Sequence, residues 1–336
     1  IGFIYLKDDL IFVKFNNIEF EKIRDFYTLS VINEIKDEVS YEYLFKPIRE
    51  KLPKNISKIY IKNDGIFNNI NLETIYLKDN QEYVFNEYDI EYVETPNSIF
   101  SNTVFDFNTA FLFGNPLFRK NQESNGVRSR ISQLPNTKIE IDEINDLLIN
   151  SGIKSIKTDG IESNEKNLYA NSNSDIIHIA THGFYNDKFI IEGRTNRFNY
   201  GLLASNYDEN ILKGNADNYS IDGVIYGGEI LYKNFTNNNL LILSACETGV
   251  GESFSLGTEN LANAFLRAGS KNIISTLWPV DDQITKDFMV EFYRNLITSN
   301  NIYQALSKTK EKFKQTYRHP KYWGAFVLLS NSIWGN

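Results

Sequence analysis

Two residues of the chain, Cys246 and His182, have the types that could together cut a peptide bond. Acyl transfer from a peptide needs a nucleophile, a base that takes its proton, and hydrogen-bond donors for the oxyanion. A free thiol with a pKa of about 8.5 is only a few per cent ionised at neutral pH, but a neighbouring imidazolium lowers that pKa by several units. Cys246 is therefore the candidate nucleophile and His182 the candidate base. The backbone N–H groups of Gly183, which allows a tight turn, and of Cys246 are the candidate oxyanion donors.

These residues also have a simpler interpretation, which stays open at this point. A single cysteine behind an apolar strand is commonly a small core residue, because free cysteine is among the most buried residue types. His178 is expected to be an interior histidine that supports the site, and Thr181 is placed with it in that supporting role. His178 and His182 are four strand positions apart, about 13 Å, which is too far for one metal ion. We therefore expect neither a metal nor a cofactor.

Two other motifs, a phosphatase loop and a nucleotide-binding loop, are incomplete in this sequence. A cysteine-based phosphatase loop requires an arginine six positions after its cysteine, where the chain has Glu252. Gly249, Gly251 and Gly257 give the segment the glycine content of an anion cradle, but no Gly-Lys-Ser/Thr follows, so the nucleotide signal is weak. A small-molecule hydrolase or a nucleotide-binding protein would lack the local motif that it needs.

The elements that must position Cys246 and His182 alternate regularly in the second half of the chain. Apolar runs predict strands at 153–156, 176–180, 240–244, 272–276 and 325–329, and helical periodicity predicts helices at 139–150, 162–169, 258–268 and two within 281–317. Continuous apolar strands separated by helices indicate a mostly parallel sheet covered on both faces, an αβα sandwich. His182 and Cys246 each follow the end of such a strand, and neighbouring parallel strands bring their carboxyl ends to one edge of the sheet.

The first half of the chain has a more mixed pattern. It predicts a strand hairpin within 3–15, helices at 23–35 and 41–52, a strand at 59–61, and short strands near Val84-Phe85 and at 90–93. A polar segment, 119–135, is expected to be a flexible connector. The long polar stretch 186–222 is expected to be a loop near the site that gates the substrate.

Composition limits the classes of function and partner. The formal charge of -8 is spread without a run of Lys or Arg, so direct nucleic-acid binding is not expected. The sequence shows neither a signal peptide nor a membrane-spanning stretch, and its one cysteine rules out an intramolecular disulfide. We therefore expect a soluble protein in a reducing cytoplasm. Abundant Ile, Asn and Lys hints at an AT-rich bacterial genome, and a start at Ile1 suggests an excerpt of a longer chain.

Four ordered blocks of sequence resemble the CHAT domain family, relatives of caspases and separase in clan CD. They are DIIHIATHG at 175–183, LSACETG at 243–249, STLWPVDD at 275–282 and HPKYWG at 319–324. Three segments of the first half, YEYLFKPI at 41–48, IYIKNDG at 59–65 and LPNT at 134–137, also resemble the family. The resemblance implies a caspase-like αβα sandwich in which an inactive pseudo-caspase half, 1–118, a connector, 119–136, and an active half, 137–336, follow one another.

The resemblance also implies a function. By match of position, Cys246 and His182 are the dyad of a cysteine endopeptidase that cleaves a protein substrate. Asp281 or Asp282 would line the pocket for a basic residue before the cut, and Glu247 is placed with them as substrate-binding; capping of the following helix is the alternative role for Asp281. Family members are often fused to tetratricopeptide-like repeats and activated by a partner. A catalytically inactive caspase-like interaction module remains the alternative function.

Overall fold

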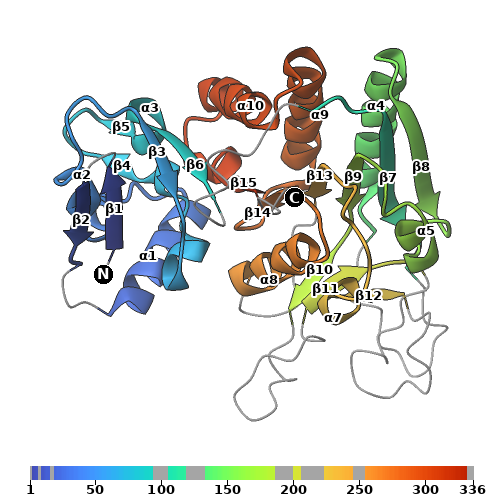
Figure 1. Ribbon diagram of the computed structural model, residues 1–336, viewed down its shortest axis with the longest axis horizontal. Helices are drawn as coiled ribbons and strands as arrows, with labels where there is room; N and C mark the ends of the chain where they lie inside the picture. The colour runs from blue at the N-terminus through green and yellow to red at the C-terminus, as the bar shows by residue number, and fades with distance from the viewer. Residues whose placement is uncertain are drawn as a thin grey trace, which may run out of the picture.

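A computed structural model of the protein describes residues 2–6, 9–15, 19–93, 105–118, 133–185, 200–205, 223–244 and 254–330. Its central feature is a six-stranded sheet with the order β15-β14-β13-β9-β7-β8 (Figure 1). The strands are β7 (Thr109–Pro116), β8 (Lys154–Gly160), β9 (Ile176–Ala180), β13 (Leu240–Leu243), β14 (Asn272–Thr276) and β15 (Phe326–Ser330). Neighbouring strands of this sheet are parallel, apart from the antiparallel pair β14 and β15.

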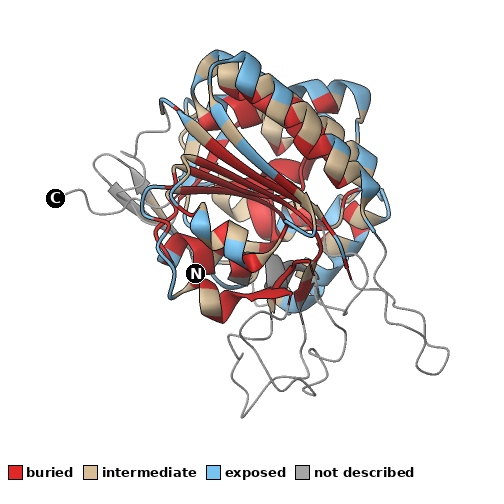
Figure 2. Cartoon of the chain, turned by 90° about the vertical axis from the view of Figure 1, so that its right-hand side faces the viewer, coloured by how far each residue is buried: buried red, intermediate tan, exposed pale blue. Residues whose placement is uncertain are grey.

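The middle strands of this sheet are buried on both faces. Every residue of β9, β13 and β14 is buried, and Figure 2 shows the strands in the buried colour between helices whose outer sides are exposed. Continuous apolar runs such as Leu240–Leu243 suit this environment, because neither face of the strand meets water. The predicted αβα sandwich with a mostly parallel sheet is confirmed, and the predicted strands 176–180 and 272–276 have the observed bounds.

Helices cover the two faces of the sheet separately (Figure 1). One face packs against α4 (Pro135–Asn150), α9 (Asp282–Ser299) and α10 (Ile302–Thr316). The other face packs against α5 (Glu165–Ala170), α7 (Gly227–Ile230) and α8 (Phe254–Arg267), and the side chains of α8 are described from residue 261 onward. Across the described ranges, every helix is too short or too polar to pass through a lipid bilayer.

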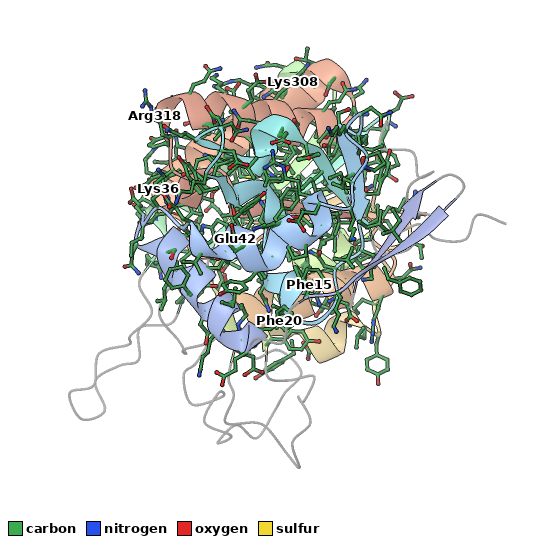
Figure 3. All side chains as sticks on the ribbon, turned by 90° about the vertical axis from the view of Figure 1, so that its left-hand side faces the viewer. Phe15, Phe20, Lys36, Glu42, Lys308 and Arg318 are labelled. Atoms are coloured by element: carbon green, nitrogen blue, oxygen red, sulfur yellow. The ribbon has the colours of Figure 1, made fainter. Side chains whose placement is uncertain are left out.

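The amino-terminal part of the chain forms its own set of small elements beside the sheet. Strands β1 and β2 form the predicted antiparallel hairpin, and β3 pairs in parallel with β6. Below the hairpin, the rings of Phe15 and Phe20 meet edge to face with centroids 6.0 Å apart (Figure 3). The elements are β1 (Gly2–Leu6), β2 (Asp9–Val13), α1 (Phe20–Ile32), the π-helical turn η1 (Tyr41–Phe45), α2 (Lys46–Arg49), β3 (Lys58–Ile61), η2 (Gly65–Asn69), η3 (Leu72–Thr74), β4 (Tyr76–Leu77), β5 (Glu82–Tyr83), α3 (Val84–Glu87) and β6 (Asp89–Tyr92).

The two parts of the chain share one hydrophobic core. A parallel bridge joins Val93, after β6, to Ser330 of β15. Trp323, just after the 3-10 turn η6 (Pro320–Tyr322), packs against Tyr83 and Phe85 with ring centroids 5.8 and 5.3 Å away. A Cβ added to the next residue, Gly324, would lie 2.2 Å from Thr74 Cγ2, so only glycine fits this contact. The HPKYWG block therefore serves to join the two parts of the fold.

At four places the described structure differs from the sequence-based expectations or leaves them outside the described residues. Val84 and Phe85 do not form a strand: they begin α3, where Val84 N–H bonds to Ile75 O and Tyr88 N–H bonds back to Val84 O. Strand β7, which the sequence analysis does not predict, precedes the expected connector and yet lies inside the six-stranded sheet. The predicted helix 41–52 is a π-helical turn followed by the short α2. Of the expected connector, residues 119–132 lie outside the described part of the chain, and α4 begins at Pro135.

Candidate active site

The carboxyl ends of β9 and β13 lie next to each other in the sheet. The two strands are parallel neighbours in which Leu243 is opposite Ile179, and the N–H of Ser244 donates to Ile179 O at 2.9 Å. His182 lies two residues beyond the end of β9, and position 246 lies two residues beyond Ser244. The sheet therefore brings together the two strand ends from which the chain continues to the predicted dyad. Cys246 and Glu247 themselves lie outside the described residues.

The backbone at His182 is held by a second, small sheet. This sheet has the order β10-β11-β12 and is formed by Gly183–Tyr185, Tyr200–Leu203 and Val224–Tyr226. The carbonyl of His182 accepts from Leu203 N–H at 2.8 Å, and the Thr181 hydroxyl donates to Leu203 O at 2.6 Å. Thr181 thus ties the turn between β9 and β10 to β11. The stretch 186–222 is not one continuous loop, because β11 lies within it.

The imidazole of His182 lies against an aromatic ring. The rings of His182 and Phe118 have centroids 5.6 Å apart and an interplanar angle of 42°. His182 is only 4% exposed. Phe118 belongs to a small apolar cluster with Phe184, Leu203, Val224 and Tyr226. The ring is therefore confined on one side by apolar contacts, which restricts its orientation.

Gly183 is placed so that its N–H points away from β11. It begins β10 opposite Leu202. In an antiparallel pair, hydrogen-bonded positions alternate with positions that are not bonded across the pair. Because His182 O accepts from Leu203 N–H, the next position, Gly183, is of the second kind. This orientation is compatible with the predicted role of Gly183 N–H as an oxyanion donor.

His178 is held in a buried polar cluster on the helix-α4 face of the sheet. Its Nε2 lies 2.9 Å from Oε1 of Glu140, and its Nδ1 lies 3.3 Å from the hydroxyl of Tyr293. The same Oε1 of Glu140 accepts from the hydroxyl of Ser244 at 2.8 Å. Burial, together with the charge of Glu140, raises the pKa of Tyr293 well above its ordinary value of 10.0. The expectation that His178 is an interior histidine with satisfied hydrogen bonds agrees with this geometry.

Asp281 and Asp282 lie at the start of α9 and differ in their surroundings. Asp281 is the N-cap: its Oδ1 accepts from Gln283 N–H at 2.9 Å and from Ile284 N–H at 3.2 Å. Asp281 therefore caps α9, as the alternative role for this residue predicts. The pKa of Asp282 is raised above its ordinary value by burial and by the charge of Glu140, and hydrogen bonds from Asn136 oppose that shift.

Glu140 and Ser244 were missed by the sequence analysis. Helix α4 buries Thr137, Ile141, Ile144 and Leu148 along one side, and Glu140 is buried on that same side at 1% exposure. A carboxylate on the core-facing side of an amphipathic helix requires a partner, and that was the available signal. Within the part of the chain that the structure describes, no three His, Cys, Asp or Glu side chains gather closely enough to hold a metal ion.

A hollow lies at the seam between the two parts of the chain. It is lined by Asn63 after β3, by Val93 after β6, and by Ser275, Val327 and Leu329 of the six-stranded sheet. Because β6 is parallel to β15 and β15 is antiparallel to β14, the carboxyl end of β6 lies beside the amino end of β14. The hollow is therefore lined by the β14–β15 side of the sheet and not by the ends of β9 and β13.

The six-stranded, mostly parallel sheet between two layers of helices places the chain among the αβα proteins. A comparison with protein families identifies its family. The family model of the CHAT domain matches residues 39–331. The match covers most of the chain, in agreement with the four sequence blocks. The chain belongs to the CHAT domain family.

Two curated proteins resemble a short part of the chain. Tetratricopeptide repeat protein 28 of Mus musculus is 27% identical over 96 residues, which is 28% of this chain and 4% of that protein. Its Homo sapiens counterpart is 26% identical over 96 residues, with the same two shares. The chain therefore spans only a small fraction of the length of these relatives.

Solved structures of two proteases resemble the chain over most of its length. Gingipain R (RgpB), described as an Arg-specific cysteine proteinase and known from Porphyromonas gingivalis, is 11% identical with a TM-score of 0.48, and the match covers 93% of this chain and 74% of that one. The Saccharomyces cerevisiae separase–securin complex is 13% identical with a TM-score of 0.44, covering 95% of this chain and 20% of that one. Likenesses this distant assign no activity to the chain.

Proposed function

We propose that the chain is a cysteine endopeptidase domain that cleaves a protein substrate, with Cys246 as nucleophile and His182 as base. The observation that carries this proposal is the adjacency of β9 and β13, where Ser244 N–H bonds to Ile179 O at the carboxyl ends of the two strands. His182 lies two residues beyond the end of β9, and Cys246 lies three residues beyond the end of β13. Membership in the CHAT domain family supports the same assignment.

The proposed reaction uses only groups of this chain and water. His182 takes the proton of the Cys246 thiol, and the thiolate attacks the carbonyl carbon of the scissile peptide. The N–H groups of Gly183 and Cys246 stabilise the oxyanion. The protonated His182 gives its proton to the leaving amine, which leaves an acyl-enzyme thioester. Water, deprotonated by His182, attacks the thioester and releases the acid and the thiol.

The direct test is cleavage by the protein in its complete natural chain. Co-expression with candidate proteins from the same source is expected to produce a fragment that disappears in Cys246→Ala and in His182→Ala. A fragment that persists in both variants would rule out the dyad. Removal of one member of a nucleophile–base pair removes most of the rate, so both variants should be inactive to a similar degree.

For specificity, we propose that Asp281 receives a basic side chain before the cut. The cap of α9 uses Oδ1 of Asp281, so Oδ2 of this exposed side chain is not needed for the cap. Asp282 is less suited to pair with a cation, because burial and Glu140 raise its pKa. The matched variant is Asp281→Asn, because asparagine is an equally good N-cap without the charge. A preference for reporter peptides ending in Arg or Lys over Leu should fall about tenfold with an unchanged melting temperature; equal cleavage of all reporters by the wild type would contradict the assignment.

For regulation, we propose that an activating partner or a tetratricopeptide-like repeat region controls this domain. The partial match to tetratricopeptide repeat protein 28 supports an association of this kind of domain with repeats. The test compares the isolated domain with the complete natural protein and its trigger on one protein substrate. Equal cleavage by both would exclude such control.

One observation favours a different function, a caspase-like module that binds proteins without cutting them. His182 is 4% exposed, and an imidazole this covered is poorly placed to exchange protons. In such a module, Cys246 would react with iodoacetamide no faster than an ordinary thiol and His182→Ala would not change that rate. In a protease, the rate should be higher at neutral pH and should fall in His182→Ala.

A further inference from the structure

The Glu140 cluster, which we define as Glu140, His178, Ser244 and Tyr293, is buried beneath the carboxyl ends of β9 and β13. Its centre is one oxygen, Oε1 of Glu140, which lies 2.9 Å from His178 Nε2 and 2.8 Å from Ser244 Oγ. The two partners come from neighbouring strands, and the carboxylate comes from α4. One side chain therefore joins the middle of β9 to the residue that follows β13, two places that are far apart in the sequence.

The hydrogen bonds of the cluster can all be satisfied at once. With its proton on Nε2, the imidazole of His178 donates to Glu140, and its Nδ1 accepts from the hydroxyl of Tyr293. Tyr293 stays protonated at neutral pH because its pKa is raised well above 10. The hydroxyl of Ser244 donates to Glu140. A network with every partner in place holds its members in one geometry.

The members of the cluster lie close in sequence to both members of the proposed dyad. His178 lies four residues before His182, and Ser244 lies two residues before Cys246. A strand residue advances the chain by about 3.3 Å, so the bond to Ser244 lies within roughly 7 Å of chain from the nucleophile. A change at Glu140 or Ser244 therefore acts on the two segments whose separation sets the distance between thiol and imidazole.

We propose that Glu140 and Ser244 are positioning residues for the dyad: the Glu140 carboxylate joins His178, in the middle of β9, to Ser244, just after β13, and so fixes Cys246 relative to His182. This inference rests on the proposed function. Burial of a carboxylate is costly, and an apolar contact of similar volume is often at least as stable. The geometry that the carboxylate imposes on His178 and Ser244 is a reason for burying it at that cost.

The groups that face the cluster come from three directions. Helix α9 contributes the Tyr293 hydroxyl and Asp282, whose raised pKa reflects burial and the charge of Glu140. Strand β9 contributes His178, and the end of β13 contributes Ser244. The nearby cation of α9, Lys286, bonds to Glu143 and Asp287. The described hydrogen bonds of Glu140 are thus made with His178 of β9 and with Ser244 after β13.

Cys246 itself reports on the test, because it is the only cysteine in the chain. The rate of its alkylation by iodoacetamide as a function of pH gives the pKa and reactivity of one thiol, without knowledge of the substrate. Ser244→Ala removes the hydroxyl that Glu140 binds, and Ser244→Thr retains a hydroxyl. Glu140→Gln retains the shape of the side chain and one acceptor oxygen. The matched control is Ser330→Ala, which removes a buried serine bonded to Asn272 at 2.8 Å on the far side of the same sheet.

The proposal expects Ser244→Ala to lower the alkylation rate at pH 7 about tenfold and to raise the apparent pKa of the thiol, because small displacements of paired groups are costly in rate. Ser244→Thr should return to within about twofold of the wild type, Glu140→Gln should resemble Ser244→Ala, and Ser330→Ala should be unchanged. The urea midpoint of each variant shows whether the variant is folded under the conditions of the alkylation measurement. If Glu140→Gln fails to fold, the pair Ser244→Ala and Ser244→Thr still decides.

Two outcomes overturn the inference, and they differ in meaning. If the wild-type thiol has a lowered pKa and both Ser244→Ala and Glu140→Gln stay within about twofold of it, positioning by the cluster is wrong while the proposed function stands. If the wild-type thiol titrates at its ordinary value of about 8.5, the dyad is not formed, and the proposed function fails together with the inference.

Discussion

The two faces of the six-stranded sheet are built from the same strands and yet differ in chemistry. On the face toward α8, the strands contribute a row of apolar side chains to the core, Phe111, Phe113, Ile177, Ile179, Leu241, Leu243 and Ile273, and the buried Ser275 also lies on this face. On the face toward α4 and α9, His178 lies between Ile176 and Ala180 of β9 and meets Glu140 and Tyr293. The buried polar cluster around Glu140 therefore lies on one face, at the strand that leads to His182.

Apolar and polar side chains contribute to a buried face in different ways. An apolar face gains free energy from burial at every position and needs no particular partner, since about 25 cal/mol is gained for each Å² removed from water. A polar group on the other face is tolerated only when its partners are in place, and a missing partner costs about 1–3 kcal/mol. The apolar contacts on both faces therefore supply stability, and the Glu140 cluster supplies a fixed geometry next to the candidate site.

The largest effect is expected on the apolar face. Phe265 of α8 is fully buried, and its ring meets that of Phe235 edge to face with centroids 5.1 Å apart. Phe265→Ala should lower the free energy of unfolding by about 3–5 kcal/mol, because a large cavity is left in the core. Urea unfolding followed by circular dichroism measures the change. The control is Ile161→Ala, a residue that is 48% exposed and should cost less than about 1 kcal/mol. Equal effects of the two variants would mean that this face does not supply the stability.

A smaller loss is expected on the polar face. Glu140→Ala leaves His178 and Ser244 without their shared acceptor and should cost about 2–3 kcal/mol in the same measurement. Glu143 lies on the same helix, is 42% exposed in its side chain and pairs with Lys286 at 3.4 Å. Glu143→Ala should cost less than about 1 kcal/mol. If the Glu140 variant lost no more than the Glu143 variant, the described hydrogen bonds would not contribute to stability.

The smallest effect depends on pH and concerns Asp282. Its folded-state pKa is raised, so the folded protein binds this proton more tightly than the unfolded chain, whose Asp titrates near 3.9. Stability should therefore fall as the pH rises from about 3.9 through the raised pKa. Asp282→Asn removes this charge and should be slightly more stable at pH 7, by less than about 1 kcal/mol because the group is half-exposed. The advantage should vanish near pH 3.5; a constant difference at both pH values would contradict the assigned cause.

Some of the fold could be predicted because the signal is local. The apolar runs of β9 and β14 are bounded by polar residues, and the two strands have the predicted limits. The paired apolar residues Val84 and Phe85 carried no such information, since a run of two is compatible with a strand or a helix. The structure places them at the start of α3, where Val84 N–H bonds to Ile75 O.

The candidate site likewise has a part that local sequence predicts and a part that depends on contacts distant in the chain. The sequence placed His182 and Cys246 just beyond two apolar strands, and the structure makes these strands neighbours, while the approach of Cys246 to His182 stays a prediction. Nothing in the sequence links Glu140 to His178, 38 positions later, or to Ser244, 104 positions later. Those contacts depend on which strands pair and on which helix covers them.

The sequence by itself determined the alternation of strands and helices, the αβα class and, through its four blocks, the family. Only the tertiary structure decided that β7 enters the sheet from before the expected connector, that Trp323 joins the two parts of the chain, and that Glu140 lies beneath the ends of β9 and β13. The physical reason is range: periodicity records which side of one element is buried, whereas a hydrogen bond across the core is fixed by the order and packing of elements distant in the chain.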